Sequence, residues 1–306
     1  MNRHTYDLAS LRNGFHDPTT RIEISPLRAQ PRSTDGSRGI AARIERATLT
    51  PQGPGTIVVE ISPEGECRAN AWGPGAEWLK ERVPRLTARS TEFRPIDARH
   101  HELARALRTI GHLHLPASDT PYHEVIPAVL GQRITATQAL RQWVVLCERY
   151  GEPAPGPLRL RLPPTPTRLQ RVASWEFHQL GIEQQRARAL LTVARHATYI
   201  DETRKLDGTR AREALMRLPG IGVWTAAVAI GVSHGDPDAL PVGDFHVKNT
   251  VAWALNGRAR GSDEEMLKTL EPYVGQRWQV ARTLERAGLG APRFGARRRV
   301  LDIARL

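Results

Sequence analysis

Cysteine is scarce in this chain of 306 residues. Cys67 and Cys147 are the only two, and they lie far apart in the sequence. Two thiols cannot by themselves complete a structural zinc site or a four-cysteine iron–sulfur cluster. A disulfide between them stays open at this point, although two thiols fit the reducing cytosol better than an oxidising compartment.

Long apolar runs are also absent. No stretch of eighteen apolar residues occurs, so no membrane-spanning helix is expected. The N-terminus lacks the apolar core of a secretory signal, and we therefore expect a cytoplasmic protein. Apolar residues still make up 40% of the chain, which allows a packed core in two domains or one large one.

Negative charge is in the minority. Lysine and arginine number 44 against 32 aspartates and glutamates, which gives a net charge of +12. Such a balance favours a polyanionic partner without identifying it. Nearly all of the positive charge is arginine. The guanidinium group suits phosphate, but arginine usage also follows genomic composition. Residues 291–306 are expected to form a basic tail outside the folded core, although a solvated tail that only aids solubility is the alternative.

Residues 1–97 predict a small N-terminal α+β domain. Residues 56–61 are rich in β-branched side chains and predict a strand, and 39–49 and 67–72 are its expected antiparallel neighbours. Residues 75–83 predict a short helix. The first 38 residues are polar with scattered proline, glycine and serine, so at least part of this start is expected to be poorly ordered.

From residue 98 to 290 the pattern becomes helical, and no convincing strand is seen. The fold class is therefore α+β, with an all-α second domain. The expected helices cover residues 101–111, 122–150 with an interruption near 131–135, 167–175, 183–200, 210–218, 223–232, 245–255, 264–274 and 278–288.

The stretch from 209 to 256 organises the second domain. Two helical runs meet at Leu218-Pro219-Gly220-Ile221-Gly222, which predicts a helix-hairpin-helix over residues 210–232. Pro219 cannot continue the first helix, and the two glycines allow a tight turn with uncovered amides. The second helix then starts with free N–H groups and a positive dipole end, an arrangement that suits a phosphate.

Asp244 is the candidate for chemistry. It follows Gly243 and stands where the N-cap of the next helix should be. An aspartate before a helix is usually only a cap, and that is the alternative. The hairpin some twenty residues earlier favours the functional interpretation.

These motifs resemble the helix-hairpin-helix DNA glycosylase superfamily. LPGIGVWTA matches the hairpin motif, LGQ at 130–132 matches the loop before it, and the likeness runs from about residue 112 to 288. Within the superfamily the chain is similar to the bacterial 3-methyladenine DNA glycosylase II group, which also has an N-terminal α+β unit. The resemblance implies a monofunctional enzyme of base excision repair that releases alkylated bases, such as 3-methyladenine, from duplex DNA. It implies a monomer that associates with the nucleoid through DNA.

The resemblance also assigns roles to residues. Asp244 would be the catalytic carboxylate, which stabilises positive charge on the sugar and orients water. Arg133 stands where the family commonly has an apolar wedge, so its role could be plugging the vacated stack or holding a phosphate. The residues expected to contact DNA are Gln132, Arg133, Thr135, Gly220, Gly222, Thr225 and Lys248. The backbone carbonyls expected to hold a monovalent cation, Na or K, are those of Met216, Leu218 and Ile221. No other cofactor is expected, and the iron–sulfur cluster of some relatives is excluded by the cysteine count.

Trp224 stands where bifunctional members carry a nucleophilic lysine, so no Schiff base is expected there. Its ring could face an electron-poor base, with ordinary core packing as the alternative. Val228 and Glu285 replace aromatic residues of the group's base pocket. The side chains expected to rebuild that pocket with Trp224 are Tyr122, Phe245, His246 and Trp278.

Two other functions stay open on the sequence alone. One is a helix-hairpin-helix protein that binds DNA without catalysis. The other is a glycosylase for a different, oxidised or bulky lesion. Asp244 and Trp224 together favour the alkylated-base enzyme over the first alternative, whereas the replaced pocket aromatics keep the second one open.

Overall fold

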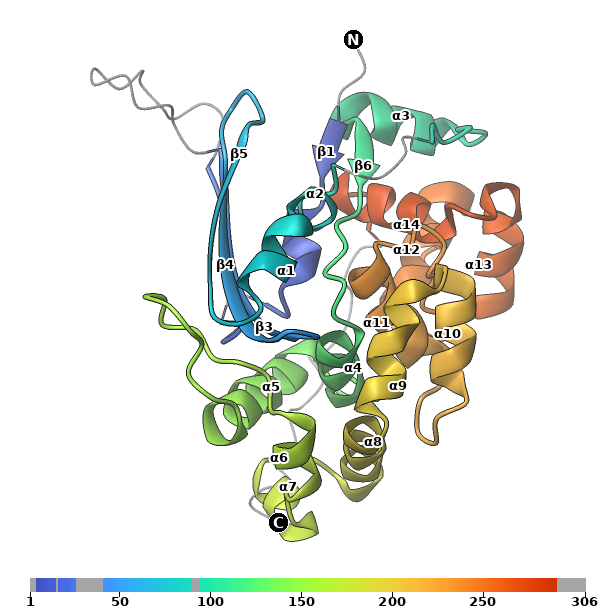
Figure 1. The fold of residues 1–306 in the computed structure, drawn as a ribbon. Helices are drawn as coiled ribbons and strands as arrows, with labels where there is room; N and C mark the ends of the chain where they lie inside the picture. Colours follow the sequence, from blue (N-terminus) through green and yellow to red (C-terminus); the bar gives the residue numbers. More distant parts are fainter. Residues whose placement is uncertain (1–3, 15, 26–40, 90–93, 291–306) are drawn as a thin grey trace.

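The structure is a computed structural model that describes residues 4–14, 16–25, 41–89 and 94–290 (Figure 1). The predicted basic tail, 291–306, lies outside the described residues. An antiparallel sheet stands on one side of the molecule, and helices with one short pair of parallel strands make up the rest (Figure 1). The α+β class is therefore confirmed.

The sheet has four antiparallel strands in sequence order, β2 to β5. They are β2 (Thr20–Ile24), β3 (Ala42–Thr50), β4 (Gly53–Ile61) and β5 (Cys67–Trp72). The strand predicted from β-branched content is β4, and its two expected neighbours are β3 and β5. Two short helices, α1 (Ala76–Glu81) and α2 (Val83–Leu86), follow, and α1 covers one face, where Trp78 and Leu79 pack on buried Ile57 and Val59.

The expectation of no strand after residue 98 was wrong. A short strand β6 (His112–His114) pairs in parallel with β1 (His4–Tyr6), and a 3₁₀ helix η1 (Leu8–Leu11) follows β1. Three residues are too few to show a strand period, and the partner lies more than a hundred positions away. The described parts of the first 38 residues thus contain β1, η1 and β2, where we expected at least some poor order.

The remaining chain is helical, with α3 (His101–Ile110) leading into the hairpin region. The helices that follow are α4 (Pro121–Leu130), α5 (Ala136–Tyr150), α6 (Pro166–Gln170), α7 (Ser174–Gln179), α8 (Gln184–Arg195), α9 (Ala197–Glu202), the 3₁₀ turn η2 (Thr203–Lys205), α10 (Gly208–Met216), α11 (Val223–His234), α12 (Phe245–Asn256), α13 (Asp263–Leu270), η3 (Glu271–Tyr273) and α14 (Arg277–Arg286).

Two helices expected to be continuous are broken. The run 167–175 divides into α6 and α7 because Ala173 adopts an extended conformation, and its amide is capped by Glu176. The run 183–200 divides into α8 and α9 at His196, whose backbone leaves the helical region. The apolar spacing continues across both breaks, which is why periodicity alone did not reveal them.

The helices form two apolar cores. One is built by α4, α5, α8, α10 and α11 around Trp143 and Phe177, both fully buried. The other is built by α3, α12, α13 and α14 around Leu103 and Leu270. The helices α10 and α11 belong to the first core and α12 to the second, so the loops before α11 and α12 lie where the two cores meet.

The N-terminal unit is tied to the helices by buried polar groups. The Arg46 guanidinium on β3 donates hydrogen bonds to Thr120 and to the Glu124 carboxylate of α4, and both charged side chains are at most 4% exposed. His123 hydrogen-bonds Thr48 of β3. The cost of removing two charges from water offsets much of the attraction within a buried ion pair. This contact therefore fixes the position of the sheet relative to α4 more than it stabilises the fold.

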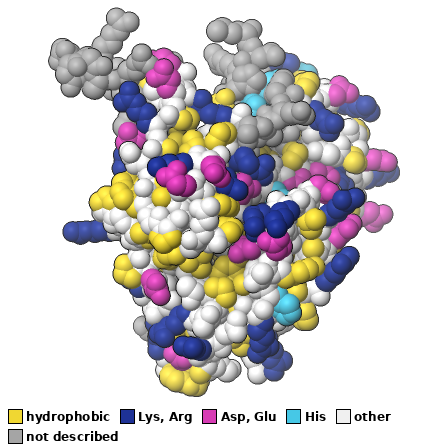
Figure 2. All heavy atoms as spheres, in the orientation of Figure 1, with side chains coloured by type: hydrophobic (Ala, Val, Ile, Leu, Met, Phe, Trp, Pro, Cys, Tyr) yellow, Lys and Arg dark blue, Asp and Glu magenta, His cyan; other side chains and the backbone are white. Residues whose placement is uncertain are grey.

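The surface carries both signs of charge. Figure 2 shows lysine and arginine side chains interspersed with aspartate and glutamate on one face. Many of them are paired, as in Lys80 with Glu77 and Arg258 with Glu265. Both cysteines are free thiols. Within the described ranges no helix is long and apolar enough to cross a membrane.

Candidate active site

The hairpin between α10 and α11 exposes a row of backbone amides. Asp207 caps α10 by accepting the Arg210 N–H, and the chain then turns through Gly220 at φ +88°. Gly222 is the N-cap of α11 and has an extended backbone. A Cβ added at this position would meet no atom within 4 Å. Because the first N–H groups of a helix lack intrahelical acceptors, this turn offers donors to an anion.

Gln132 locks the hairpin to the loop between α4 and α5. Its amide donates to the Gly220 carbonyl and to the Thr225 hydroxyl, both at 2.9 Å. Arg133 follows with φ +60°, an uncommon conformation for a residue with a side chain, and it is exposed. Gln132 therefore fixes the loop, while Arg133 extends from it into solvent.

Two residues expected to contact DNA have other structural roles. The Thr135 hydroxyl accepts the Gln138 N–H and, with the Gln138 side chain, forms a capping box at the start of α5. Thr225 is only 2% exposed, and its hydroxyl accepts from Gln132. The Thr225 side chain is thus part of the link between the two loops, and a DNA contact of this residue stays a prediction.

Asp244 is the N-cap of α12 and also faces the hairpin. Its Oδ1 accepts the N–H groups of His246 and Val247 at 2.7 and 3.0 Å. Its Oδ2 accepts the indole N–H of Trp224 at 3.0 Å. The predicted cap is confirmed, and the Trp224 contact gives this carboxyl a second partner from the hairpin helix. Three N–H donors thus point at the oxygens of this one carboxyl group.

The turn that carries Asp244 is held from outside by Asp263 at the start of α13. Asp263 accepts the Gly243 N–H and the Lys248 ammonium, each at 2.9 Å. Burial opposes its charge, but these hydrogen bonds lower the pKa of Asp263. Lys248, expected as a phosphate clamp or a solvated residue, is paired here. No sequence pattern marked Asp263, because its two partners lie 20 and 15 residues away in the sequence.

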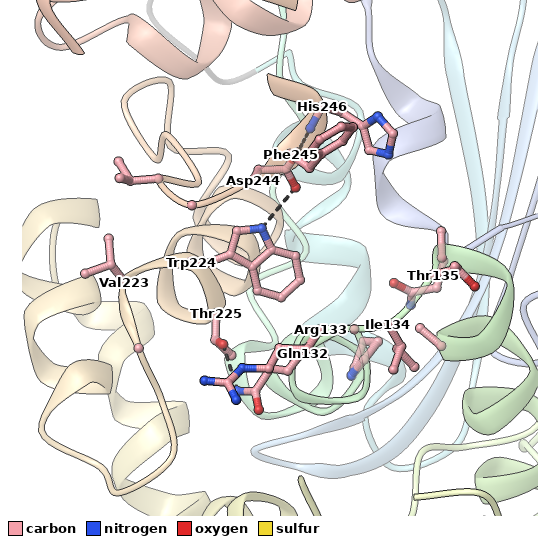
Figure 3. A pocket seen from close by; sticks show the side chains of 18 of the residues that line it. Gln132, Arg133, Ile134, Thr135, Val223, Trp224, Thr225, Asp244, Phe245 and His246 are labelled. Carbon is pink, nitrogen blue, oxygen red and sulfur yellow. Dashed lines mark hydrogen bonds between the residues drawn. The ribbon is translucent and has the colours of Figure 1, made fainter. Parts of the chain in front are cut away.

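These elements surround an open cleft of about 1920 Å³. Figure 3 shows the Trp224 ring lying between Asp244 and the loop that carries Gln132 and Arg133, with Phe245 and His246 beside Asp244. The expected site residues that line this cleft are Gln132, Arg133, Thr135, Gly220, Ile221, Gly222, Trp224, Thr225, Asp244, Phe245 and His246. The structure thus brings together most of the residues singled out in the sequence.

Tyr122 and Trp278 do not line the cleft, and this corrects their expected place in a base pocket. Tyr122 is 2% exposed, and its hydroxyl donates to the Pro164 carbonyl at 3.0 Å. Burial, helped by the charge of Asp201, raises the pKa of Tyr122. Trp278 is half-buried and packs against the core of α3, α12 and α14. Both positions result from the way the helices pack. The apolar period of the sequence predicts the helices but not which neighbour each side chain faces.

Glu285 on α14 is a lining residue that the sequence presented only as a replaced aromatic position. Burial raises the pKa of Glu285, and the nearby negative charges of Asp244 and Asp7 act in the same direction. Arg282 opposes them, because its guanidinium donates to the Glu285 carboxylate at 2.6 Å. The cleft therefore holds two carboxyl groups in different surroundings.

The carbonyls expected to hold a monovalent cation lie in the same hairpin. Oxygen ligands suit such an ion. The Leu218 carbonyl already accepts the Ile221 N–H at 3.1 Å, which leaves it one lone pair. Elsewhere, the described chain has no group of three or more histidine, cysteine, aspartate or glutamate side chains placed to hold a metal ion. The cation with Met216, Leu218 and Ile221 stays a prediction.

Residues 126–276, about half of the chain, match the HhH-GPD superfamily of base excision DNA repair proteins. The matched segment begins in α4, includes the hairpin and Asp244, and ends just before α14. This part of the chain belongs to that superfamily, as the hairpin motif had indicated.

Two curated relatives and one solved structure show the nearer likeness. The chain is 30% identical over 130 residues to the probable bifunctional transcriptional activator/DNA repair enzyme AlkA of Mycobacterium tuberculosis, covering 40% of this chain and 25% of that protein. It is 30% identical over 116 residues to the DNA-3-methyladenine glycosylase 2 of Escherichia coli, covering 37% of this chain and 41% of that protein. The chain thus spans less than half the length of these relatives.

The 3-methyladenine DNA glycosylase of Archaeoglobus fulgidus has a similar structure, with a TM-score of 0.63 and 16% identity. The likeness covers 79% of this chain and 85% of that one. At this level of identity the match establishes the shared fold. Because it extends beyond the family segment, it includes part of the chain outside residues 126–276.

Proposed function

We propose that this chain is a monofunctional DNA glycosylase that hydrolyses the N-glycosidic bond of alkylated bases, such as 3-methyladenine, in duplex DNA. One observation carries the proposal: Asp244, on the turn before α12, and Trp224, beside the hairpin, meet through a hydrogen bond inside an open cleft. The Archaeoglobus and Escherichia proteins are named for 3-methyladenine, which supports this class of substrate. The chain acts as a monomer on nucleoid DNA in the cytoplasm.

The chemistry needs a negative charge beside the sugar of an extruded nucleotide. Breaking the bond between C1′ and the base nitrogen sends the bonding electron pair to the base and leaves positive charge on the sugar. Asp244 stabilises that charge, and water adds to C1′ and releases one proton to the solvent. A base that is already cationic leaves as a neutral molecule, so it needs no general acid. One carboxylate therefore suffices for this substrate class.

The same geometry supports hydrolysis without strand cleavage. Trp224 has no amine, and the lysine nearest to Asp244 in the sequence, Lys248, is held by Asp263 in an ion pair. A Schiff base needs a free amine at the sugar, and neither residue provides one. The expected products are the free base and a strand with an intact abasic site.

The hairpin supplies the anchor for duplex DNA. The amides that follow Gly222 can bind a backbone phosphate, while the Gln132 contact holds this turn against the loop that carries Arg133. Arg133 extends from the rim of the cleft, where it could fill the space left by the extruded base. The damaged base would then enter the cleft beside Trp224.

The test is base release from a panel of duplex oligonucleotides, each with one lesion, including 3-methyladenine, 7-methylguanine, hypoxanthine and 8-oxoguanine. Asp244→Asn should lose about two or more orders of magnitude in rate and still bind DNA, because asparagine can cap α12 but carries no charge. Borohydride should trap no covalent complex.

Three results would contradict the proposal. Base release by Asp244→Asn at the wild-type rate would leave Asp244 as a cap alone. Release of 8-oxoguanine but of no alkylated base would establish a different lesion. Tight DNA binding with no release of any base from the panel would favour a protein that binds DNA without catalysis.

A further inference from the structure

The carboxylate of Glu285 is held in a fixed position at the cleft. It lies on the last turn of α14, and Arg282, three residues earlier, donates to its Oε2 at 2.6 Å. An ordinary exposed pair of this spacing is mobile and contributes little. This pair is different, because its side chains are only 21% and 25% exposed and Arg282 has a second partner.

That second partner is Asp7, from the other end of the chain. Its Oδ2 accepts both Nε and Nη2 of Arg282, at 2.9 and 2.6 Å, and the Asp7 side chain is fully buried. Asp7 thereby fixes the plane of the guanidinium and leaves Nη1 for Glu285. Arg286 adds a longer contact to Asp7, at 3.8 Å. The Glu285 carboxylate is therefore positioned by two layers of charge-assisted contacts.

Glu285 also stands where the local charge favours a cation. Arg282 and Arg286 together balance the charges of Asp7 and Glu285. Asp244 lines the same cleft and adds a further negative charge. Among the residues that the structure describes, Arg282 donates to the Oε2 of Glu285 and no donor lies at its Oε1. A carboxylate oxygen can accept from the N–H groups on the edge of a purine.

We propose that Glu285 is a specificity residue of this cleft, one that selects extruded purines that are positively charged and present an N–H edge, over neutral bases. This inference rests on the proposed glycosylase function and deepens it. Glu285 contacts the base, whereas Asp244 acts on the sugar. Arg282 and Asp7 act through Glu285 and are positioning residues. At the position of Glu285, the resembled group selects its bases by stacking on an aromatic ring. In this chain the Glu285 carboxylate takes over that selection by attracting a cationic base.

The test compares kcat/KM for two duplexes that differ only in the lesion, one with cationic 7-methylguanine and one with neutral hypoxanthine. Glu285→Gln keeps the shape and removes the charge. It should lower the ratio of the two values about tenfold, because the hydrogen bond to the base remains possible but loses the charge of its acceptor. Glu285→Asp keeps the charge and should retain a larger part of the preference. Glu264→Gln, an exposed change on α13, should leave the ratio unchanged.

Thermal unfolding of each variant controls for folding, and a purely structural role would lower both kcat/KM values by the same factor. An unchanged ratio in Glu285→Gln, with base release intact, would overturn the specificity role and leave the glycosylase function standing. No release of either base by the wild-type chain would instead refute the proposed function, and this inference with it. If Glu285→Gln does not fold, Glu285→Ala, which also removes the carboxylate, decides, because a ratio equal to that of the wild type overturns the proposal.

Discussion

The indole N–H of Trp224 donates to the Asp244 carboxylate at 3.0 Å, across twenty residues of sequence. This contact joins the first helix turn after the hairpin to the turn before α12. The tip of the Trp224 ring lies over Gly131, where an added side chain would approach it to 3.1 Å. The Trp224 ring therefore lies between these two loops, and its N–H points at Asp244, the candidate catalytic residue.

Trp224→Phe should lower kcat by about tenfold to a hundredfold, because Asp244 loses a hydrogen-bond donor to its charged group. The phenyl ring keeps an apolar face, so KM should change little. Single-turnover base release measures the effect. Trp253→Phe, on the solvent side of α12, is the matched control and should behave like the wild type. A Trp224→Phe variant with unchanged kcat would show that the hydrogen bond does not orient the carboxylate.

Gly222→Ala should weaken binding to damaged and undamaged duplex alike, since a Cβ there would obstruct the approach of a phosphate. The change is tolerated by the fold, because nothing lies within 4 Å and the backbone is extended. Gly220→Ala is a poor probe of DNA contact: φ is +88°, and the added Cβ would lie 2.8 Å from Ala189. The measurement is the DNA affinity of each variant as a function of salt concentration. Equal affinities of Gly222→Ala and the wild type would show that the hairpin does not contact DNA.

Asp263→Ala should lower kcat roughly tenfold without abolishing DNA binding, because the Gly243 turn loses its anchor and Asp244 moves away from its productive position. Lys248→Met removes only the ion pair, so its kcat should fall less. If Lys248 also contacts a phosphate, the slope of log affinity against log salt should drop by about 0.9 in Lys248→Met. Wild-type kcat in Asp263→Ala would mean that the turn holds its shape unaided.

Acidification should destabilise the fold through its buried histidines. Burial, and then the charge of Arg46, holds the pKa of His123 well below its usual range, and burial lowers the pKa of His234. The unfolded chain therefore takes up these protons first. The stabilisation is fully present above about pH 6.5 and is lost as pH falls towards the folded values, by up to about 1.4 kcal/mol per pH unit and proton.

Urea unfolding at pH 7.5, 6.5 and 5.5 measures this loss. His123→Gln keeps a polar side chain between Thr19 and Thr48 and should make the loss with acidification smaller by one proton. His196→Gln, an exposed change between α8 and α9, is the control. The same pH slope in His123→Gln and wild type would place the proton uptake elsewhere.

The sequence by itself determined the local features. The Pro-Gly-Ile-Gly spacing set the hairpin, the Asp244 cap fixed the start of α12, and the β-branched run at 56–61 marked β4. Each of these depends on backbone groups a few residues apart, so propensity and spacing are enough to predict them. The family likeness added the meaning of Asp244, which spacing alone left as a cap.

Only the tertiary structure decided which of these side chains meet. Gln132 reaches Gly220 across 88 residues, and Asp7 reaches Arg282 across 275. The sequence period showed that Tyr122 and Trp278 lie on helices, but packing directed both away from the cleft and brought Glu285 to it. Such contacts depend on how whole helices pack against one another, and a short sequence pattern carries no record of that packing.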